Sequence, residues 1–141
     1  MVSEKHPEVK SLRDVTEEQL LILVKPVSKV IYNRCSYVLA ENLRVLQGCE
    51  DLQNKDLVQF GKRMFKTHEG LQNLYEVSCP ELDCLVEGVR NHAAVFGARM
   101  MGGGFGGGTI NLVKENEVAD LVNEIAAHYR KVMKKDLKVY I

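Results

Sequence analysis

The feature that most constrains this chain is a run of seven residues, 102–108, in which every residue except Phe105 is glycine. Fixing each glycine in a fold costs conformational entropy, so such a run needs a physical reason. Three reasons are available: backbone with positive φ, backbone close to a ligand or another chain segment, or a nest of N–H groups facing an anion. We expect Phe105 to fix the loop by burying its ring.

The glycine run lies between two segments that have the period of a β-strand. Residues 94–101 alternate between an apolar face and an opposite face that holds Arg99. Residues 109–113 resume the alternation, so we expect two antiparallel strands joined by the glycines. Residues 137–141 alternate again, which predicts a third strand.

The first two thirds of the chain has helical periodicity. Thr16 and Gln19 form a capping box that opens a short helix, and Pro26 suits the first turn of a long second helix. We expect Gly48 to end that long helix and Asn54 to cap the next one.

The later helices carry similar signals. Gly70 is expected to interrupt the helical pattern, and Ser78 with Glu81 forms a capping box that places Pro80 in the first turn of the following helix. An apolar stripe over residues 118–133, with basic residues near its end, predicts a last helix.

Length and composition indicate a single domain. The chain has 141 residues and is 45% hydrophobic, which suits one compact folding unit of the α+β class, helix-rich with a small antiparallel sheet. Its 19 basic and 19 acidic residues cancel, so nothing favours nucleic acid or an anionic membrane as a partner. The N-terminus is polar, and no stretch approaches the roughly 20 apolar residues of a membrane span.

The four cysteines indicate the compartment. Cys35, Cys49, Cys79 and Cys84 contain no C-x-x-C pair, so we expect free, partly buried thiols and no metal site. Free thiols are typical of a reducing compartment, and we expect a cytoplasmic protein.

The glycine run excludes several nucleotide-binding loops. Gly102, Gly104 and Gly107 match G-x-G-x-x-G, but a dinucleotide site needs a helix next, and here a strand follows. No Gly-Lys-Ser or Gly-Lys-Thr closes the run, which excludes a Walker loop, and the protein-kinase catalytic motifs are missing. A flexible, functionless hairpin remains the simple alternative.

The strand and the glycines together resemble a known motif. Residues 96–107, FGARMMGGGFGG, are similar to the third motif of GHMP kinases in the form that galactokinases carry. Residues 75–83, YEVSCPELD, and residues 11–14, SLRD, also resemble galactokinase stretches, so the likeness covers essentially the whole chain. Met101 and Gly108 depart from the family, which usually has a hydroxyl residue and often a cysteine there.

The resemblance implies a fold and an activity. It implies a GHMP kinase C-terminal domain over residues 1–141 and, in the full-length enzyme, transfer of the ATP γ-phosphate to the anomeric hydroxyl of galactose with Mg²⁺. The glycine motif would shape the cleft beside the phosphate-binding loop, which assigns that role to Gly102, Gly103, Gly104, Phe105, Gly106 and Gly107.

The rest of the family's chemistry belongs to an N-terminal lobe. The sugar-recognition motif, the serine-rich phosphate loop and the proposed aspartate base do not occur in residues 1–141. We therefore expect no catalytic residue in this chain, no tight binding of ATP or Mg²⁺ by it alone, and negligible kinase activity. The expected partner is the enzyme's own N-terminal lobe, and without that lobe the chain is expected to self-associate.

Arg99 and Ser78 each have a functional and a structural interpretation, and His68 has a structural one. Arg99 could meet a phosphate, although a surface or interdomain salt bridge is the commoner role. Ser78 could be a cleft residue, although it reads first as a helix cap. His68 is placed at a helix end, where capping or exposure is usual.

Two other functions stay open. One is a stand-alone, non-catalytic module of the same fold that binds a ligand or a protein. The other is a kinase for a related sugar, such as N-acetylgalactosamine.

Overall fold

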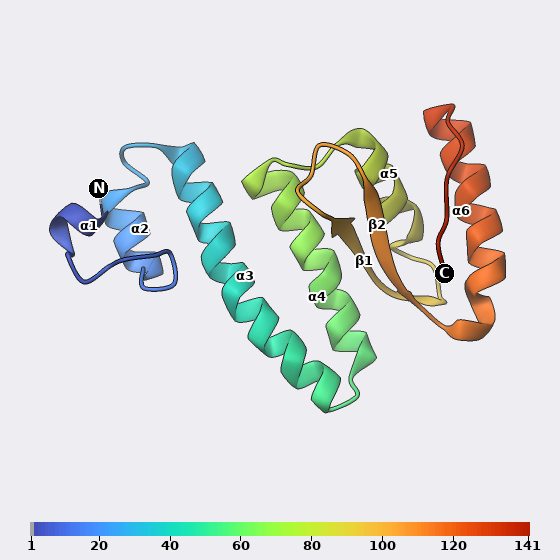
Figure 1. Ribbon diagram of the computed structural model, residues 1–141, viewed down its shortest axis with the longest axis horizontal. Coiled ribbons are helices and arrows are strands. Elements are labelled where there is room, and N and C mark those ends of the chain that lie inside the picture. Colours follow the sequence, from blue (N-terminus) through green and yellow to red (C-terminus); the bar gives the residue numbers. More distant parts are fainter. Residues whose placement is uncertain (1) are drawn as a thin grey trace.

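The computed structural model describes residues 2–141 and has an elongated shape (Figure 1). Two short helices occupy one end, a hairpin of two long helices crosses the middle, and a two-stranded sheet with two more helices forms the other end. The elements are α1 (Val2–Lys5), α2 (Glu17–Leu23), α3 (Lys29–Gln53), α4 (Leu57–Gly70), the π-helical turn η1 (Leu71–Tyr75), α5 (Pro80–Val89), β1 (Val95–Met101), β2 (Gly108–Val113), the 3₁₀ turn η2 (Glu115–Glu117) and α6 (Val118–Met133).

This architecture confirms the expected α+β class. Helices dominate, the two strands pair antiparallel across the glycines, and the last helix has the predicted bounds. No helix among residues 2–141 is long and apolar enough to cross a membrane.

The start of α2 confirms the capping box, but α3 begins later than expected. Thr16 accepts a hydrogen bond from the backbone N–H of Gln19, whose side chain returns to the backbone of Thr16. Pro26 lies in a turn before α3, which starts at Lys29. Ser28 caps it by accepting from the N–H of Ile31 at 3.3 Å. A cap with a side-chain oxygen thus sets the start of the helix, and the proline does not.

Gly48 does not end α3, and Asn54 does not cap α4. Gly48 is buried inside α3, where a Cβ would lie 3.4 Å from the ring of Phe60, so this glycine serves packing. Asn54 closes α3, and Asp56 caps α4 by accepting from the N–H of Gln59 at 3.0 Å. The connection is tight, because Lys55 between the two caps has a left-handed φ of 58°.

Gly70 ends α4, but the chain does not leave helical structure there. A Cβ there would lie 2.4 Å from Cδ2 of Tyr37, so the ring packs directly on the α4 backbone. Helical structure continues through η1 until Glu76, whose φ of 60° stops it. The predicted capping box of α5 is also wrong: Cys79 is the cap residue without a side-chain bond, although Pro80 does take the first position.

The sheet has two strands among the described residues. Met101 pairs with Gly108 next to the loop, and Gly97 pairs with Leu112 after an irregularity near Val95. The third strand predicted at residues 137–141 is wrong, because this segment has no backbone pairing partner among residues 2–141. Alternating side chains alone do not make a strand without a neighbour to satisfy its backbone.

The core forms where α4, α5 and α6 cover the sheet. Ala98 and Met100 on β1 are at most 1% exposed, which confirms the predicted apolar face of this strand. Val86, Val89 and Leu121 pack with Ala98 in the centre of the core.

The backbones of α4 and β1 touch at two glycines. A Cβ on Gly61 would lie 1.9 Å from the carbonyl oxygen of Phe96, and a Cβ on Gly97 would lie 2.3 Å from that of Gly61. Neither clash could be relieved by rotating a side chain. Helix and strand can therefore approach this closely only because both residues are glycine.

We predict that Gly61→Ala lowers the free energy of unfolding by about 3 kcal/mol, because the new methyl group displaces α4 from β1. Gly48→Ala is the matched control, since it also replaces a buried glycine inside a helix but meets only the edge of a ring. It should be neutral or stabilise by up to about 1 kcal/mol. Chemical denaturation followed by circular dichroism measures both, and equal effects would contradict the close crossing of α4 and β1.

Candidate functional site: the glycine loop

The glycine loop, residues 102–107, connects β1 to β2. Four of its glycines have positive φ: Gly102 at 88°, Gly104 at 92°, Gly106 at 138° and Gly107 at 101°. Only glycine adopts such conformations at no steric cost. Left-handed backbone is therefore one confirmed reason for the run.

Close packing is a second reason, and it applies to Gly104. The N–H of Phe105 donates to the carbonyl of Val77 at 2.7 Å, which holds the middle of the loop against the segment between η1 and α5. A Cβ on Gly104 would lie 2.2 Å from that carbonyl oxygen. The loop thus rests on Val77 through bare backbone.

The prediction that Phe105 fixes the loop by burying its ring is wrong. Its side chain is 78% exposed, and its backbone has a left-handed φ of 62°. The loop is fixed by the Phe105 N–H and not by burial of the ring. The sequence could not reveal this, because the hydrogen bond depends on where Val77 lies in space.

Nothing among the described residues requires glycine at position 103. Its φ is not positive, and a Cβ there would meet no atom within 4 Å. It is exposed at the outer side of the loop. An alanine could replace it without strain in this chain.

A partly buried polar cluster lies beside the loop, and we call it the His68 cluster. It is made of the buried His68, the backbone N–H of the buried Met100, and the partly buried side chains of Ser78 and Asp83. His68 is 2% exposed, and its Nδ1 accepts from the N–H of Met100 at 3.2 Å. Its Nε2 lies 3.2 Å from Oδ1 of Asp83. Ser78 donates its hydroxyl to the same carboxylate oxygen.

Two sequence predictions are corrected by this cluster. Ser78 does not cap α5, because its hydroxyl is used by Asp83. His68 is neither a cap nor exposed, because it lies within α4 on the face that meets β1. The spacing of seven residues from Gly61, two helical turns, is the signal that could have placed it on that face.

Burial lowers the pKa of His68 below its ordinary value of 6.5. The carboxylates of Asp83 and Glu69 act against this shift, and Arg90 adds to it. A neutral imidazole is also what the contacts require, since Nδ1 can accept from Met100 only when it carries no proton.

Arg99 makes no ion pair among the described residues. Its guanidinium donates to the carbonyl of Met100 at 3.2 Å and is half-buried near Tyr37. Burial raises the pKa of the Tyr37 hydroxyl, and the neighbouring Glu41 adds to that rise. The structure does not bring Arg99 to a carboxylate of this chain, and its phosphate role remains a prediction.

The cysteines are free, as predicted. Burial raises the pKa of the Cys35 and Cys84 thiols, whereas Cys49 is exposed and not partly buried. Across residues 2–141, no group of three or more His, Cys, Asp or Glu side chains is arranged to hold a metal ion.

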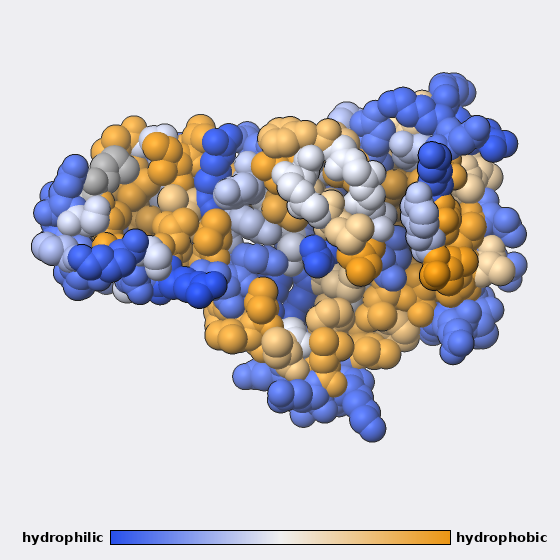
Figure 2. Space-filling view, viewed as in Figure 1, coloured by the Kyte–Doolittle hydropathy of each residue, from blue (hydrophilic) through white to orange (hydrophobic). Residues whose placement is uncertain are grey.

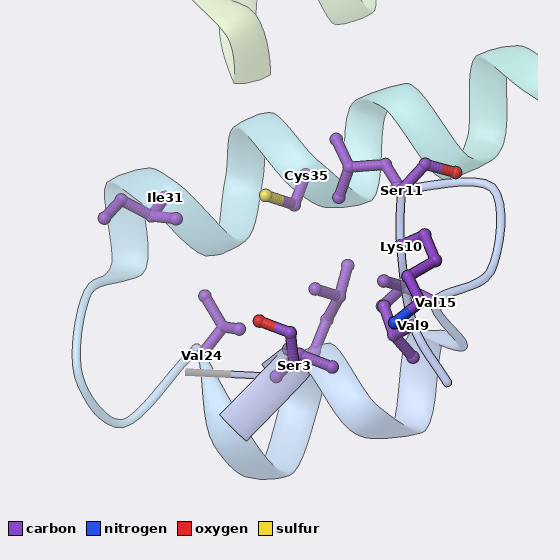
Figure 3. A pocket seen from close by; sticks show the side chains of 11 residues that line it. Ser3, Val9, Lys10, Ser11, Val15, Val24, Ile31 and Cys35 are labelled. Carbon is purple, nitrogen blue, oxygen red and sulfur yellow. The ribbon is translucent and has the colours of Figure 1, made fainter. Parts of the chain in front are cut away.

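A groove and a pocket are found among the described residues. A groove of about 1080 Å³ between β2, α5, α6 and the C-terminal segment is lined by Phe105 and residues 106–108 at one end and is otherwise mostly apolar. A pocket of about 250 Å³ is formed entirely by residues 2–35, with Ile31 and Cys35 of α3 on one side and Val24 on the other (Figure 3). This pocket contains no residue of the glycine loop.

Comparison with known proteins identifies the fold and its loop. The family model for the C-terminal domain of GHMP kinases matches residues 49–131, which include η1, the His68 cluster and the whole glycine loop. The chain belongs to the GHMP kinase family. The match of the family model confirms the resemblance seen in residues 96–107.

The relatives of this GHMP kinase chain are galactokinases. It is 42% identical to the galactokinase of Thermotoga maritima over 130 residues, which cover 92% of this chain and 36% of that protein. The human galactokinase is 40% identical over 119 residues, 84% of this chain and 30% of the other. The chain thus spans about a third of the length of these curated relatives.

A solved structure gives the same result. The crystal structure of Lactococcus lactis galactokinase complexed with galactose matches 99% of this GHMP kinase chain with a TM-score of 0.90 and 27% identity. The match covers 36% of that chain.

We predict that the chain loses stability between pH 7.5 and pH 5.5 because of His68. The folded pKa is lowered, so the unfolded state takes up a proton near 6.5 that the folded state resists. The stabilisation that comes from keeping His68 neutral is fully present above pH 6.5. It is lost as the pH falls towards the pKa of His68 in the folded state. Thermal midpoints over this range should fall less steeply for His68→Asn than for the unsubstituted chain.

His128→Asn is the control, because His128 lies exposed on α6. It should keep the slope of the unsubstituted chain. If the thermal midpoint of His68→Asn falls with pH as steeply as that of the unsubstituted chain, the conclusion that His68 is buried in its neutral form is wrong.

Proposed function

We propose that this chain provides the C-terminal, loop-bearing part of a galactokinase, which transfers the γ-phosphate of ATP to the anomeric hydroxyl of galactose. The observation that carries the proposal is the similarity to galactokinases over more than nine tenths of the chain, including the glycine loop. In this proposal the chain's role is to complete a cleft whose substrates are held mainly by the rest of the enzyme.

The loop geometry supports this role. Phosphoryl transfer depends mainly on positioning and on electrostatic stabilisation of the transferred group. Bare backbone at Gly103, exposed and without neighbours in this chain, permits a phosphate-bearing ligand or a phosphate-binding loop to come close. The bond from Phe105 to Val77 keeps that backbone in one place.

The exposed apolar side chains support a partner lobe. Single-domain proteins rarely leave large contiguous apolar patches in water. Figure 2 shows such surface over the end of the molecule that holds α1 and α2. The large apolar side chains that are at least 46% exposed in α2, in the turn after it and in the first part of α3 are Leu21, Ile22, Val27, Val30 and Ile31. We propose that an N-terminal lobe covers part of this surface, and that the isolated chain self-associates through it.

The remaining chemistry is assigned to the rest of the enzyme. The described residues contain no group of three or more His, Cys, Asp or Glu side chains that could hold a metal ion. We propose that ATP, Mg²⁺ and the catalytic base are held outside residues 1–141, and that the isolated chain has negligible activity. Four free thiols suit a reducing compartment, which supports a cytoplasmic enzyme.

A fusion protein tests the proposal. This chain would replace the matching segment of the Thermotoga maritima galactokinase, and ADP formation would be measured with galactose, N-acetylgalactosamine or glucose. We expect ADP formation that requires both galactose and the fused chain, with none from either piece alone. A folded fusion that is inactive with every sugar would favour a non-catalytic binding module, and a preference for N-acetylgalactosamine would favour the related kinase.

Two alanine substitutions in the fusion test the loop. Gly103→Ala should leave the unfolding free energy of the 141-residue chain unchanged, because nothing in this chain lies within 4 Å. In the fusion it should lower kcat about tenfold or more, because the methyl group meets the approaching partner.

Gly108→Ala is the matched control, since its φ is not positive and it also has no neighbour within 4 Å, but it lies in β2 outside the loop. It should change neither the unfolding free energy of the 141-residue chain nor the kcat of the fusion. Full activity of Gly103→Ala would contradict close approach at the loop.

A further inference from the structure

The His68 cluster has no part in the function proposed above. Its histidine is only 2% exposed, and the cluster connects three elements: α4 through His68, β1 through Met100 and α5 through Asp83. Burying such groups costs free energy unless they are paired, so a cluster of this kind needs an explanation.

We propose that His68 is a positioning residue that holds the glycine loop at both of its supports, the strand end before it and the segment beneath its middle. The inference rests on the proposed function, because it assigns the loop's placement in the kinase to this one imidazole.

The first support is the end of β1. His68 Nδ1 gives the N–H of Met100 a fixed acceptor, and Gly102 follows only two residues later. From Gly102 onward the loop has mostly left-handed backbone, which glycine can leave as readily as it can adopt. Fixing the peptide of Met100 therefore sets the direction in which this flexible backbone starts.

The second support is Val77. Its carbonyl accepts from Phe105 in the middle of the loop, and its chain neighbour Ser78 is tied to Asp83. Asp83 in turn lies beside the other nitrogen of His68. The imidazole thus lies between the two supports, and a shift of the ring would move both.

The two ring nitrogens can be tested separately. Asparagine carries its side-chain oxygen at the position of Nδ1 and can still accept from Met100, but it cannot reach Asp83. Glutamine carries its amide at the distance of Nε2 and can reach Asp83, but it leaves the N–H of Met100 without an acceptor. A histidine needed only for filling the core would tolerate neither change better than the other.

The first experiment uses the 141-residue chain. Amide hydrogen exchange at Met100 and Phe105 would be measured by NMR in His68→Asn and His68→Gln and normalised to the unfolding free energy of each variant. We expect His68→Gln to speed exchange at Met100 about tenfold, because this amide loses its acceptor. His68→Asn should speed exchange at Phe105 several-fold, because it loses Asp83, and should leave exchange at Met100 close to that of the unsubstituted chain. Equal exchange in the two variants overturns the proposal.

The second experiment places the same variants in the fusion protein. Each variant removes one of the two supports, so both should lower kcat about tenfold with little change in KM for galactose. An inactive unsubstituted fusion would count against the proposed function only, and the exchange data would still decide the role of His68. An active fusion whose His68→Gln variant keeps full kcat overturns that role.

If His68→Gln does not fold, Ser78→Ala replaces it. This change leaves His68 and Met100 in place and removes the hydroxyl that ties Asp83 to the segment beneath the loop. Exchange at Phe105 should then rise several-fold while exchange at Met100 stays the same. Unchanged exchange at Phe105 overturns the connection between the cluster and the loop.

Discussion

The structure depends on the backbone contact between Gly61 of α4 and Gly97 of β1. From this contact, the helix advances about 10.5 Å over the seven residues to His68, and the strand advances about 10 Å over the three residues to Met100. Helix and strand therefore stay in step along their length. A side chain at either glycine would separate them, and the imidazole of His68 would no longer reach the N–H of Met100.

The position of the glycine loop depends on the alignment of α4 with β1. Because α4 and β1 run together, η1 and Val77 follow α4 to the same end of the sheet at which the glycines follow β1. The contact between Phe105 and Val77 is then local in space although the two residues are distant in sequence. In this way a helix packed against one strand fixes a loop that has no buried side chain of its own.

Much of this fold could be predicted from the sequence. The capping box at Thr16, the period of two on either side of the glycines and the stripe of α6 are local signals, and each gave the right element. The resemblance of residues 96–107 to a GHMP kinase motif predicted the family. Four glycines of this segment have positive φ in the loop.

The errors concern residues whose role depends on a distant partner. Gly48 and Gly70 resemble helix breakers in sequence, but the rings of Phe60 and Tyr37 pack on them. The ring of Phe105 is exposed, and the loop is held instead by the bond from its N–H to Val77. The segment at residues 137–141 finds no strand to pair with among the described residues.

The central claim is that this chain works as part of a galactokinase. The most direct test is to remove the protein from an extract of its source cells with an antibody raised against residues 1–141, and then to measure galactose-dependent ADP formation in the captured and remaining fractions. Galactose-dependent ADP formation should leave the extract together with the protein. Captured protein that phosphorylates no galactose, with the activity left in the extract, would contradict it.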